Sequence, residues 1–337
     1  MKQNIFQIIN ITIGCLFLST SCSLNNKELK DTHINDDSFQ KDINKLVAKE
    51  IYLNEIFDIS DLAIVENNII FQSIASDTII HVYQTPNFQL LNSFGHKGEG
   101  PMDFSNPHLY KGTNNQFLIG GFNSGKNAYR YDLKSNNIDK QDQYNILNIG
   151  EPMNNVYSFD KYLIYNNIFQ LNICKYNFEN NSTNILYSFP KDDHLESFFY
   201  SNKGILVAND SVIVYAYFYK DKIDFIDFNG NLKKSILGEK QKPHININNF
   251  NSNTTTFINA FASKSYIFLL YRGKNHDDFM KDPYKDKLLI YDNNGNYINE
   301  YRFDISPILF VFDDINNTLY GYNGLYKECI LSYYIKI

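Results

Sequence analysis

Histidine and carboxylate side chains stand together at His276, Asp277 and Asp278, a combination that can bind a divalent cation. They belong to the segment RGKNHDDFMKDPYKDK (272–287), in which Arg272 and several lysines surround them. Adjacent residues on an extended chain point apart, so a solvated loop of mixed charge is favoured over a metal site. Because functional loops are often long, we predict that this segment is the ligand-recognition loop if the chain has one.

A glycine-rich turn, HKGEG at 96–100, could present backbone N–H groups to an anion, with added charge from Lys97. A phosphate-binding loop leads into a helix, whereas this turn leads into a predicted strand. We therefore interpret it as a connection between sheets whose glycines supply positive φ. His96, Lys97 and Glu99 stay candidate binding residues. The run KDDHLE at 191–196 has a similar composition and is interpreted as another connection.

The N-terminus has the residue pattern of an export signal. A basic start precedes an apolar stretch from Ile5 to Leu18 that is too short to span a bilayer, and small residues precede Cys22. The pattern resembles a bacterial lipoprotein signal, in which the cysteine is acylated; an ordinary cleaved signal is the alternative. We predict a signal peptide over 1–22, lipidation at Cys22 in preference to Cys15, and a flexible polar tether over 23–45.

Composition limits the class of protein. A formal net charge of −6 without a basic block argues against nucleic acid as a partner. Aromatic residues make up 16% of the chain, all of them Tyr or Phe, and they lie in strand-like runs beside Ile, Val and Leu. Cys174 and Cys329 fall in the third and sixth repeats, which are predicted to lie opposite each other, beyond the Cα separation of about 7 Å that a disulfide allows. They are therefore predicted to be free, buried thiols, and without a Cys-x-x-Cys pair no zinc or redox site is implied.

A strand-turn-strand unit returns along the chain. Its clearest copy is LLIYDNNGNYINEYRF (288–303). The residues that precede the successive turns are Tyr83, Tyr131, Tyr176, Ile226 and Tyr291, with a last aromatic run at Tyr333–Tyr334. Repeats of about 40–50 residues with several strands each are typical of β-propellers. We predict an all-β domain over 46–337, a six-bladed β-propeller with four-stranded antiparallel blades.

The last predicted blade is one strand short. Its sequence holds three strands before the chain ends, and the segment LVAKEIYLNEIF (46–57) can supply the fourth. A ring closed by strands from both termini would remove the exposed sheet edges that promote aggregation.

The exit of the first predicted blade, SFGHKGEGPMDFSNP (93–107), looks like the linker of NHL-type propellers, which places glycines after a Phe-Gly pair and then Phe and Pro. The matching residues are Phe94, Gly95, Gly98, Gly100, Pro101, Phe104 and Pro107. Together with the lipoprotein start, FLLYRGK (268–274) and the 288–303 repeat, the chain resembles the TolB-like six-bladed propeller lipoproteins of Bacteroidota. The resemblance implies fold and envelope location, and it assigns no activity.

These observations predict a lipid-anchored binding module of the cell envelope without catalytic activity, whose partner is an envelope protein or a small ligand. No Gly-x-Ser-x-Gly, His-Glu-x-x-His or Walker motif occurs. The alternative is a calcium-dependent hydrolase or lyase, because similarity to gluconolactonase-type propellers would imply Ca²⁺ in the central tunnel. The run SLNNKE (23–28) holds one acid, which favours the periplasmic side of the outer membrane over the cell surface.

Overall fold

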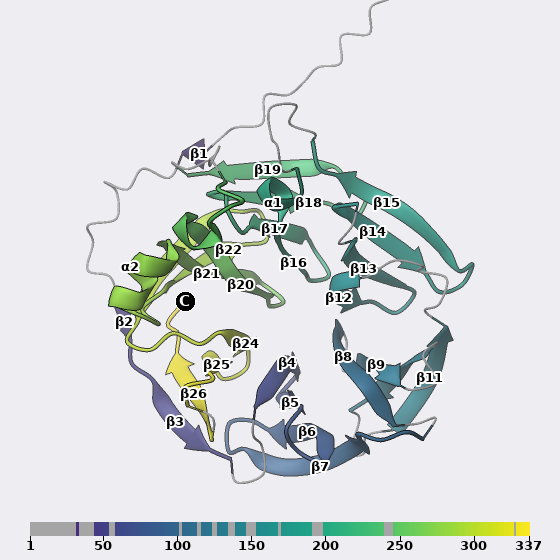
Figure 1. Ribbon diagram of the computed structural model, residues 1–337. Coiled ribbons are helices and arrows are strands. Elements are labelled where there is room, and N and C mark those ends of the chain that lie inside the picture. The colour runs from purple at the N-terminus through teal and green to yellow at the C-terminus, as the bar shows by residue number, and fades with distance from the viewer. Residues whose placement is uncertain are drawn as a thin grey trace, which may run out of the picture.

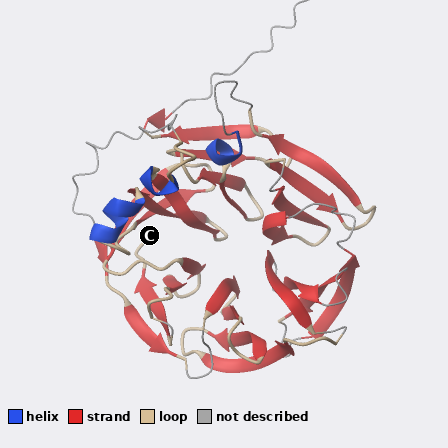
Figure 2. Cartoon of the chain, in the orientation of Figure 1, coloured by secondary structure: helices blue, strands red, loops and turns tan. Residues whose placement is uncertain are grey.

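The computed structural model describes residues 32–33, 44–53, 58–100, 103–112, 116–122, 127–133, 139–145, 153–167, 170–190, 198–238, 245–326 and 328–337. Within them the chain is mostly β-strand, and the sheets stand side by side in a ring around a central axis (Figures 1 and 2). The prediction of an all-β, propeller-like fold is confirmed. In the described part of the chain, no helix has the length and apolar character needed to cross a membrane.

The ring contains sheets of consecutive antiparallel strands. The first comprises β4 (Ile59–Val65), β5 (Asn68–Ser73), β6 (Thr78–Gln84) and β7 (Gln89–His96). The next has eight strands, namely β8 (Phe104–Gly112), β9 (Gln116–Phe122), β10 (Asn127–Asp132), β11 (Asp139–Asn145), β12 (Met153–Ser158), β13 (Tyr162–Asn167), β14 (Asn172–Asn177) and β15 (Ser182–Ser188). Its two four-stranded halves meet through a two-residue parallel pairing of β8 with β12.

Three further sheets complete the ring. Their strands are β16 (Gly204–Ala208), β17 (Ile213–Tyr217), β18 (Lys222–Ile226) and β19 (Leu232–Leu237); β20 (Thr255–Ala262), β21 (Tyr266–Lys274), β22 (Lys287–Asp292) and β23 (Tyr297–Phe303); and β24 (Leu309–Asp313), β25 (Thr318–Tyr322) and β26 (Cys329–Tyr334). Short helices precede β16 and β20 and follow β21: α1 (Phe198–Asn202), η4 (Phe250–Ser252) and α2 (His276–Lys281).

Strands from the N-terminal segment pair with the outer strands of three sheets. β1 (Thr32–His33) lies parallel to β19, β2 (Asn44–Leu46) lies parallel to β23, and β3 (Lys49–Tyr52) pairs antiparallel with β26. The predicted pairing of this segment with the last strand is confirmed, although the donated strand is shorter than 46–57. Leu46 belongs to β2 instead, because the Ala48 N–H donates to Asp304 Oδ1 at 3.1 Å and holds the connection near β23.

Burial explains why these sequences form this arrangement. Every residue of β5 and β17 is buried, and their continuous apolar runs suit strands covered on both faces by neighbouring sheets. The outer strand β15, with sequence STNILYS, is largely exposed or half-buried.

The hydrophobic core follows the ring from one sheet to the next. One cluster joins the β4–β7 sheet to β8–β10, and a second joins β8–β10 to β12–β14. A third continues through the sheets of β16 and β20, and a fourth runs from the β20 sheet through β24–β26 back to β4. Cys174 and Cys329 are free and buried in this core, as predicted.

Candidate functional site

The ring axis contains two cavities, which are lined mainly by the first strand of each four-stranded unit. We call β4, β8, β12, β16, β20 and β24 the inner strands. The Asp61 chamber has a volume of about 300 Å³, and residues of five inner strands line it. The Phe312 chamber has a volume of about 520 Å³, and residues near the ends of all six line it. Lys111 and Tyr157 line both cavities, so the chambers are neighbouring parts of one axial passage.

Irregular strand pairing coincides with the Asp61 chamber. The register of four inner strands shifts against the second strand of the same unit, and these shifts end at or span the chamber residues Asp61, His108, Asn155 and Asn259. Asn155 has a φ of 48°, in the left-handed region that Asn tolerates. Such irregularities change the direction of a side chain and occur often next to functional sites. Here they turn polar side chains of four inner strands toward one cavity.

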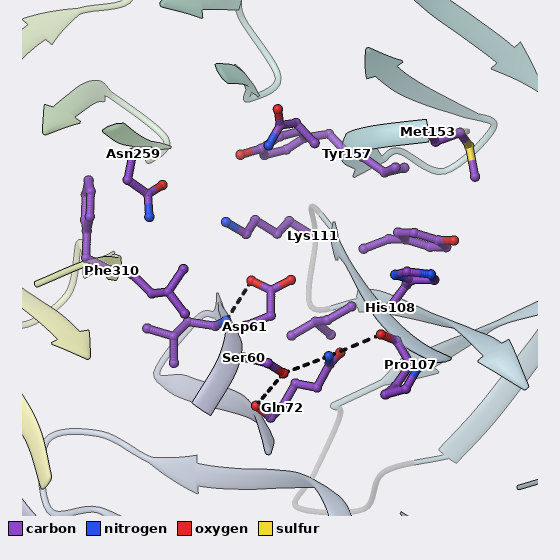
Figure 3. Close-up of a pocket in the computed structure, with 16 residues that line it drawn as sticks. Ser60, Asp61, Gln72, Pro107, His108, Lys111, Met153, Tyr157, Asn259 and Phe310 are labelled. Atoms are coloured by element: carbon purple, nitrogen blue, oxygen red, sulfur yellow. Dashed lines mark hydrogen bonds between the residues drawn. The ribbon is translucent and has the colours of Figure 1, made fainter. Parts of the chain in front are cut away.

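Asp61 is the carboxylate of this chamber. Its Oδ1 accepts a hydrogen bond from the Leu62 backbone N–H at 2.8 Å, and the Lys111 side chain extends across the cavity above it (Figure 3). Burial raises the pKa of Asp61, and the positive charges of Lys111 and His108 partly oppose that rise. The carboxyl group therefore holds a proton more readily than an exposed aspartate does.

His108 lies on the β8 side of the same cavity, with its ring stacked on Tyr110 at a centroid distance of 6.2 Å. Desolvation lowers the pKa of His108, and the nearby Asp61 carboxylate acts in the opposite direction. Part of the ring is open to solvent at the mouth of the chamber, so a neutral imidazole nitrogen can accept a proton or a hydrogen bond there. Burial raises the pKa of Tyr110 to about 12, which keeps its hydroxyl protonated.

Gln72 ties the wall of the chamber together. Its side chain is buried, and Nε2 donates to Ser60 Oγ at 3.0 Å and to the Pro107 carbonyl at 3.2 Å, which links β4, β5 and β8 (Figure 3). Its Oε1 has no hydrogen-bond partner among the described residues. A buried amide oxygen without a partner is costly, so the position of Gln72 is maintained at the expense of stability.

The Phe312 chamber has different chemistry. Phe261 and Phe312 form part of its wall, while Glu66, Asp210 and Asp314 stand exposed in the turns that follow three inner strands. Hydrogen bonds hold the rim in place. Asp314 Oδ2 accepts from the Lys264 backbone N–H at 3.2 Å. The passage therefore has polar, ionisable side chains at one end, and an apolar wall with an acidic rim at the other.

The predicted turn at 96–100 lies between the outer strand β7 and the inner strand β8, away from both chambers. His96, Lys97 and Glu99 are exposed. The Gly100 N–H donates to Asp103 Oδ2 at 2.8 Å, so a carboxylate of the chain itself occupies a position that an anion could take. At Gly95, with a φ of 80°, a Cβ atom would come within 2.4 Å of the Phe104 ring. This close approach explains why the NHL-like linker has glycine there.

The segment 272–287 includes the end of β21 and the first residue of β22, and α2 lies in the connection between these strands. Asn275 caps α2 by accepting from the Asp278 N–H at 2.9 Å, and Asp278 pairs with Lys281 at 2.7 Å. Arg272 is held by two 3.1 Å hydrogen bonds to the buried Asp286 and lies 4.0 Å from the Phe279 ring centroid. Arg272 therefore has a structural role here.

His276 and Asp277 are exposed on α2, and neither chamber includes them. Among the described residues, no group of three or more His, Cys, Asp and Glu side chains is placed to hold a metal ion. Cys22 and the run 191–196 lie outside the described residues.

Sequence reasoning missed Asp61, His108 and Lys111. Asp61 lies in an apolar run that reads as an ordinary strand, and His108 and Lys111 lie in a mixed segment that follows Pro107. Their meeting at one cavity depends on how the strands pair and are placed around the ring. The available signal was a polar residue within several inner strands, at Asp61, His108, Asn155 and Asn259.

No protein-family model and no curated protein sequence matches the chain. Solved structures do match it. A DUF4221 family member from Bacteroides vulgatus superposes with a TM-score of 0.56 at 11% identity, over 88% of this chain and 97% of that one. A protein from Bacteroides fragilis, named as a candidate exported protein, gives a TM-score of 0.55 at 10% identity, over 90% and 97% of the two chains.

A streptogramin B lyase structure is also similar, with a TM-score of 0.50 at 11% identity over 86% of this chain and 97% of that one. At such identities the likeness establishes the propeller-like fold and leaves activity undetermined.

Proposed function

We propose that this protein is an exported, lipid-anchored binding module of the cell envelope that takes up a polar ligand in the Asp61 chamber. The anchor is the acylated Cys22, on the periplasmic side of the outer membrane. The similar folds of Bacteroides proteins, one of them named as a candidate exported protein, support an envelope location. They also agree with the resemblance to TolB-like lipoproteins.

The proposed domain is a six-bladed propeller. In support, the eight-stranded sheet divides at the short β8–β12 pairing into two four-stranded units, and β3 provides a fourth strand beside β24–β26. Counted in this way, each inner strand opens one blade and contributes to the axial passage.

One observation carries the binding proposal: four register-shifted inner strands direct Asp61, His108, Asn155 and Asn259 toward the same cavity. The chamber combines a carboxylate, an amine, an imidazole and amides. This combination suits a small ligand, or a side chain of an envelope protein, that carries both hydrogen-bond donors and acceptors.

The test is ligand capture by the purified protein on arrays of envelope-derived oligosaccharides and peptides. We expect the wild type to retain a ligand and the Asp61→Ala/Lys111→Ala double variant to lose it. The control variant, His96→Ala, should bind as the wild type does, because His96 lies outside both chambers. Equal retention by the wild type and the double variant would contradict the proposal.

A lyase or hydrolase is the second candidate, and the opposed pKa shifts in the chamber favour it. Asp61, with a raised pKa, could donate a proton, while His108, with a lowered pKa, could accept one. The residues fit Ca²⁺ poorly. Asp61 is the one carboxylate among the described residues of this chamber, and Lys111 places a positive charge near it. A melting temperature that falls when a chelator is added would support the calcium-dependent alternative.

A further inference from the structure

The two faces of the ring differ in the side chains they expose. The inner strands run from the Asp61 chamber to the Phe312 chamber, so segments that precede an inner strand or follow a second strand lie on the face around the Asp61 chamber. We call this the Asp61 face. α1 and η4 precede β16 and β20, and α2 follows β21, so all three helices stand on the Asp61 face, along one arc of the ring (Figure 2).

Large apolar side chains are exposed on this face. Those on the helices and the loop beside them, which we call the ledge, are Phe199, Ile247, Phe250 and Met280, with exposures of 39%, 43%, 41% and 59%. Ile74, Ile308 and Leu325 are exposed on the same face, after β5, before β24 and after β25. Contiguous exposed apolar groups usually mark a surface that meets another apolar phase.

Contacts between the short helices hold the ledge in place. Tyr200 of the α1 helix packs on Phe250 of η4 with ring centroids 4.8 Å apart, and η4 packs on α2. Two ion pairs, Asp278–Lys281 at 2.7 Å and Asp282–Lys285 at 2.8 Å, offset part of the charge of the α2 loop, and Asp277 is exposed beside them. The ledge therefore presents apolar tips among exposed charged groups.

The position of the anchor limits how far this surface can stand from a bilayer. β1 pairs with the outer edge of β19, at Thr32 opposite Ile236, in the same sheet that α1 precedes. Only the segment 23–31 separates Cys22 from β1. At about 3.3–3.6 Å per residue, its full extension is roughly 35 Å. An acylated Cys22 thus keeps this side of the ring close to the lipid surface.

The opposite face is less suited to that contact. Glu66, Asp210 and Asp314 are exposed around the mouth of the Phe312 chamber, and anionic headgroups would repel them. Ile315 is exposed in the same turn as Asp314, and Tyr334 and Ile337 are exposed toward the same end of the ring.

We propose that the ledge rests on the membrane that holds the anchor, with Phe199, Phe250 and Met280 inserted at the boundary between headgroups and acyl chains. Aromatic and Met side chains beside charged groups of both signs suit this interface. The mouth of the Asp61 chamber then faces the lipid surface, and the acidic Phe312 face points away from it. This proposal rests on the proposed lipidation of Cys22.

The experiment uses the acylated protein in vesicles of phosphatidylethanolamine and phosphatidylglycerol. Met280→Cys carries an environment-sensitive fluorophore, and Ile315→Cys on the opposite face is the matched control. Cys174 and Cys329 are buried, so they should resist labelling of the folded protein. We expect a blue-shifted emission at position 280, and quenching by nitroxide-labelled lipid several-fold stronger than at position 315.

A second variant separates contact from proximity. Phe250→Glu in the Met280→Cys background should reduce the quenching several-fold while the protein still floats with the vesicles. Flotation with equal quenching at positions 280 and 315 would contradict the insertion of the ledge, whereas lipid anchoring would still be supported. Failure of the wild type to float would overturn the anchor and the ledge together.

Discussion

At the scale of single residues, the chamber carboxylate and the buried ion pair illustrate two effects of burial. Asp61 lies in a cavity wall where desolvation opposes its charge. Asp286 is buried as well, but it accepts two hydrogen bonds from Arg272 and one from Ser306 Oγ at 2.9 Å. The Asp61 carboxylate can exchange a proton or bind a ligand, and the Asp286 carboxylate holds the connection between β21 and β22 in place.

Asp61→Asn should stabilise the protein at neutral pH. The pKa of Asp61 is raised in the folded state, so that state binds more protons than the unfolded chain between the two pKa values. The wild type therefore loses stability as pH rises through this window. Melting curves should show a higher Tm for the variant at pH 7 and no difference below the ordinary aspartate pKa of about 3.9. A Tm difference between the variant and the wild type that grows toward low pH would contradict a raised pKa of Asp61.

Arg272→Ala should destabilise the fold strongly, because it leaves the buried Asp286 without its charged partner. Removal of one member of a buried pair costs about 3–5 kcal/mol in the free energy of unfolding. Urea unfolding measures this change. The control is Lys281→Ala, which breaks the exposed Lys281–Asp278 pair and should leave the unfolding curve almost unchanged. Similar small effects of both variants would show that Arg272 is dispensable.

At the scale of elements, the N-terminal strand β3 covers an edge that would otherwise be open. It pairs with β26 from Tyr52 opposite Cys329 to Lys49 opposite Ser332. The Leu53 N–H donates to the Glu328 carbonyl at 3.2 Å. In an antiparallel ladder the hydrogen-bonded pairs alternate, so the Ile51 N–H points toward β26 and the Glu50 N–H points outward.

Ile51→Pro should therefore disrupt closure, while Glu50→Pro should be tolerated better. Proline at position 51 removes a ladder hydrogen bond and leaves its partner unsatisfied, with an expected cost of about 1–3 kcal/mol, whereas the N–H at position 50 faces the free edge. Urea unfolding of both variants, with Ile51→Ala to account for the side chain, gives the comparison. Equal losses of unfolding free energy in the Ile51→Pro and Glu50→Pro variants would contradict the pairing register of β3 with β26.

At the scale of the whole molecule, the ring and its anchor are connected by few residues. The hydrophobic clusters lie between sheets, and none of their members precedes Leu46. The fold should therefore be independent of the lipid, although the lipid decides where the ring is.

Cys22→Ala should release the protein into the soluble periplasmic fraction with an unchanged melting temperature. Fractionation of cells and thermal unfolding of the released protein provide the measurements. If the variant stays in the membrane pellet, either Cys15 is acylated or the anchor is not a lipid. If its melting temperature falls, acylation itself contributes to the stability of the ring.

The sequence by itself determined the class of fold. Strand runs that return with their turns indicated a propeller-like ring, and the missing strand of the last unit indicated closure by the N-terminal segment, which β3 confirms. These features are readable because apolar runs and turn residues are local properties of the chain. The free, buried state of Cys174 and Cys329 also followed from their distant repeats.

Only the tertiary structure decided where the chemistry lies. The most reactive-looking runs, at 96–100 and 272–278, lie outside both chambers, and Arg272 is engaged by Asp286. Asp61, His108 and Lys111 come together because inner strands of different sheets meet at one axis, and register shifts end at Asp61 and at His108. Such convergence depends on contacts between residues far apart in the chain, and a pattern read along the chain does not contain them.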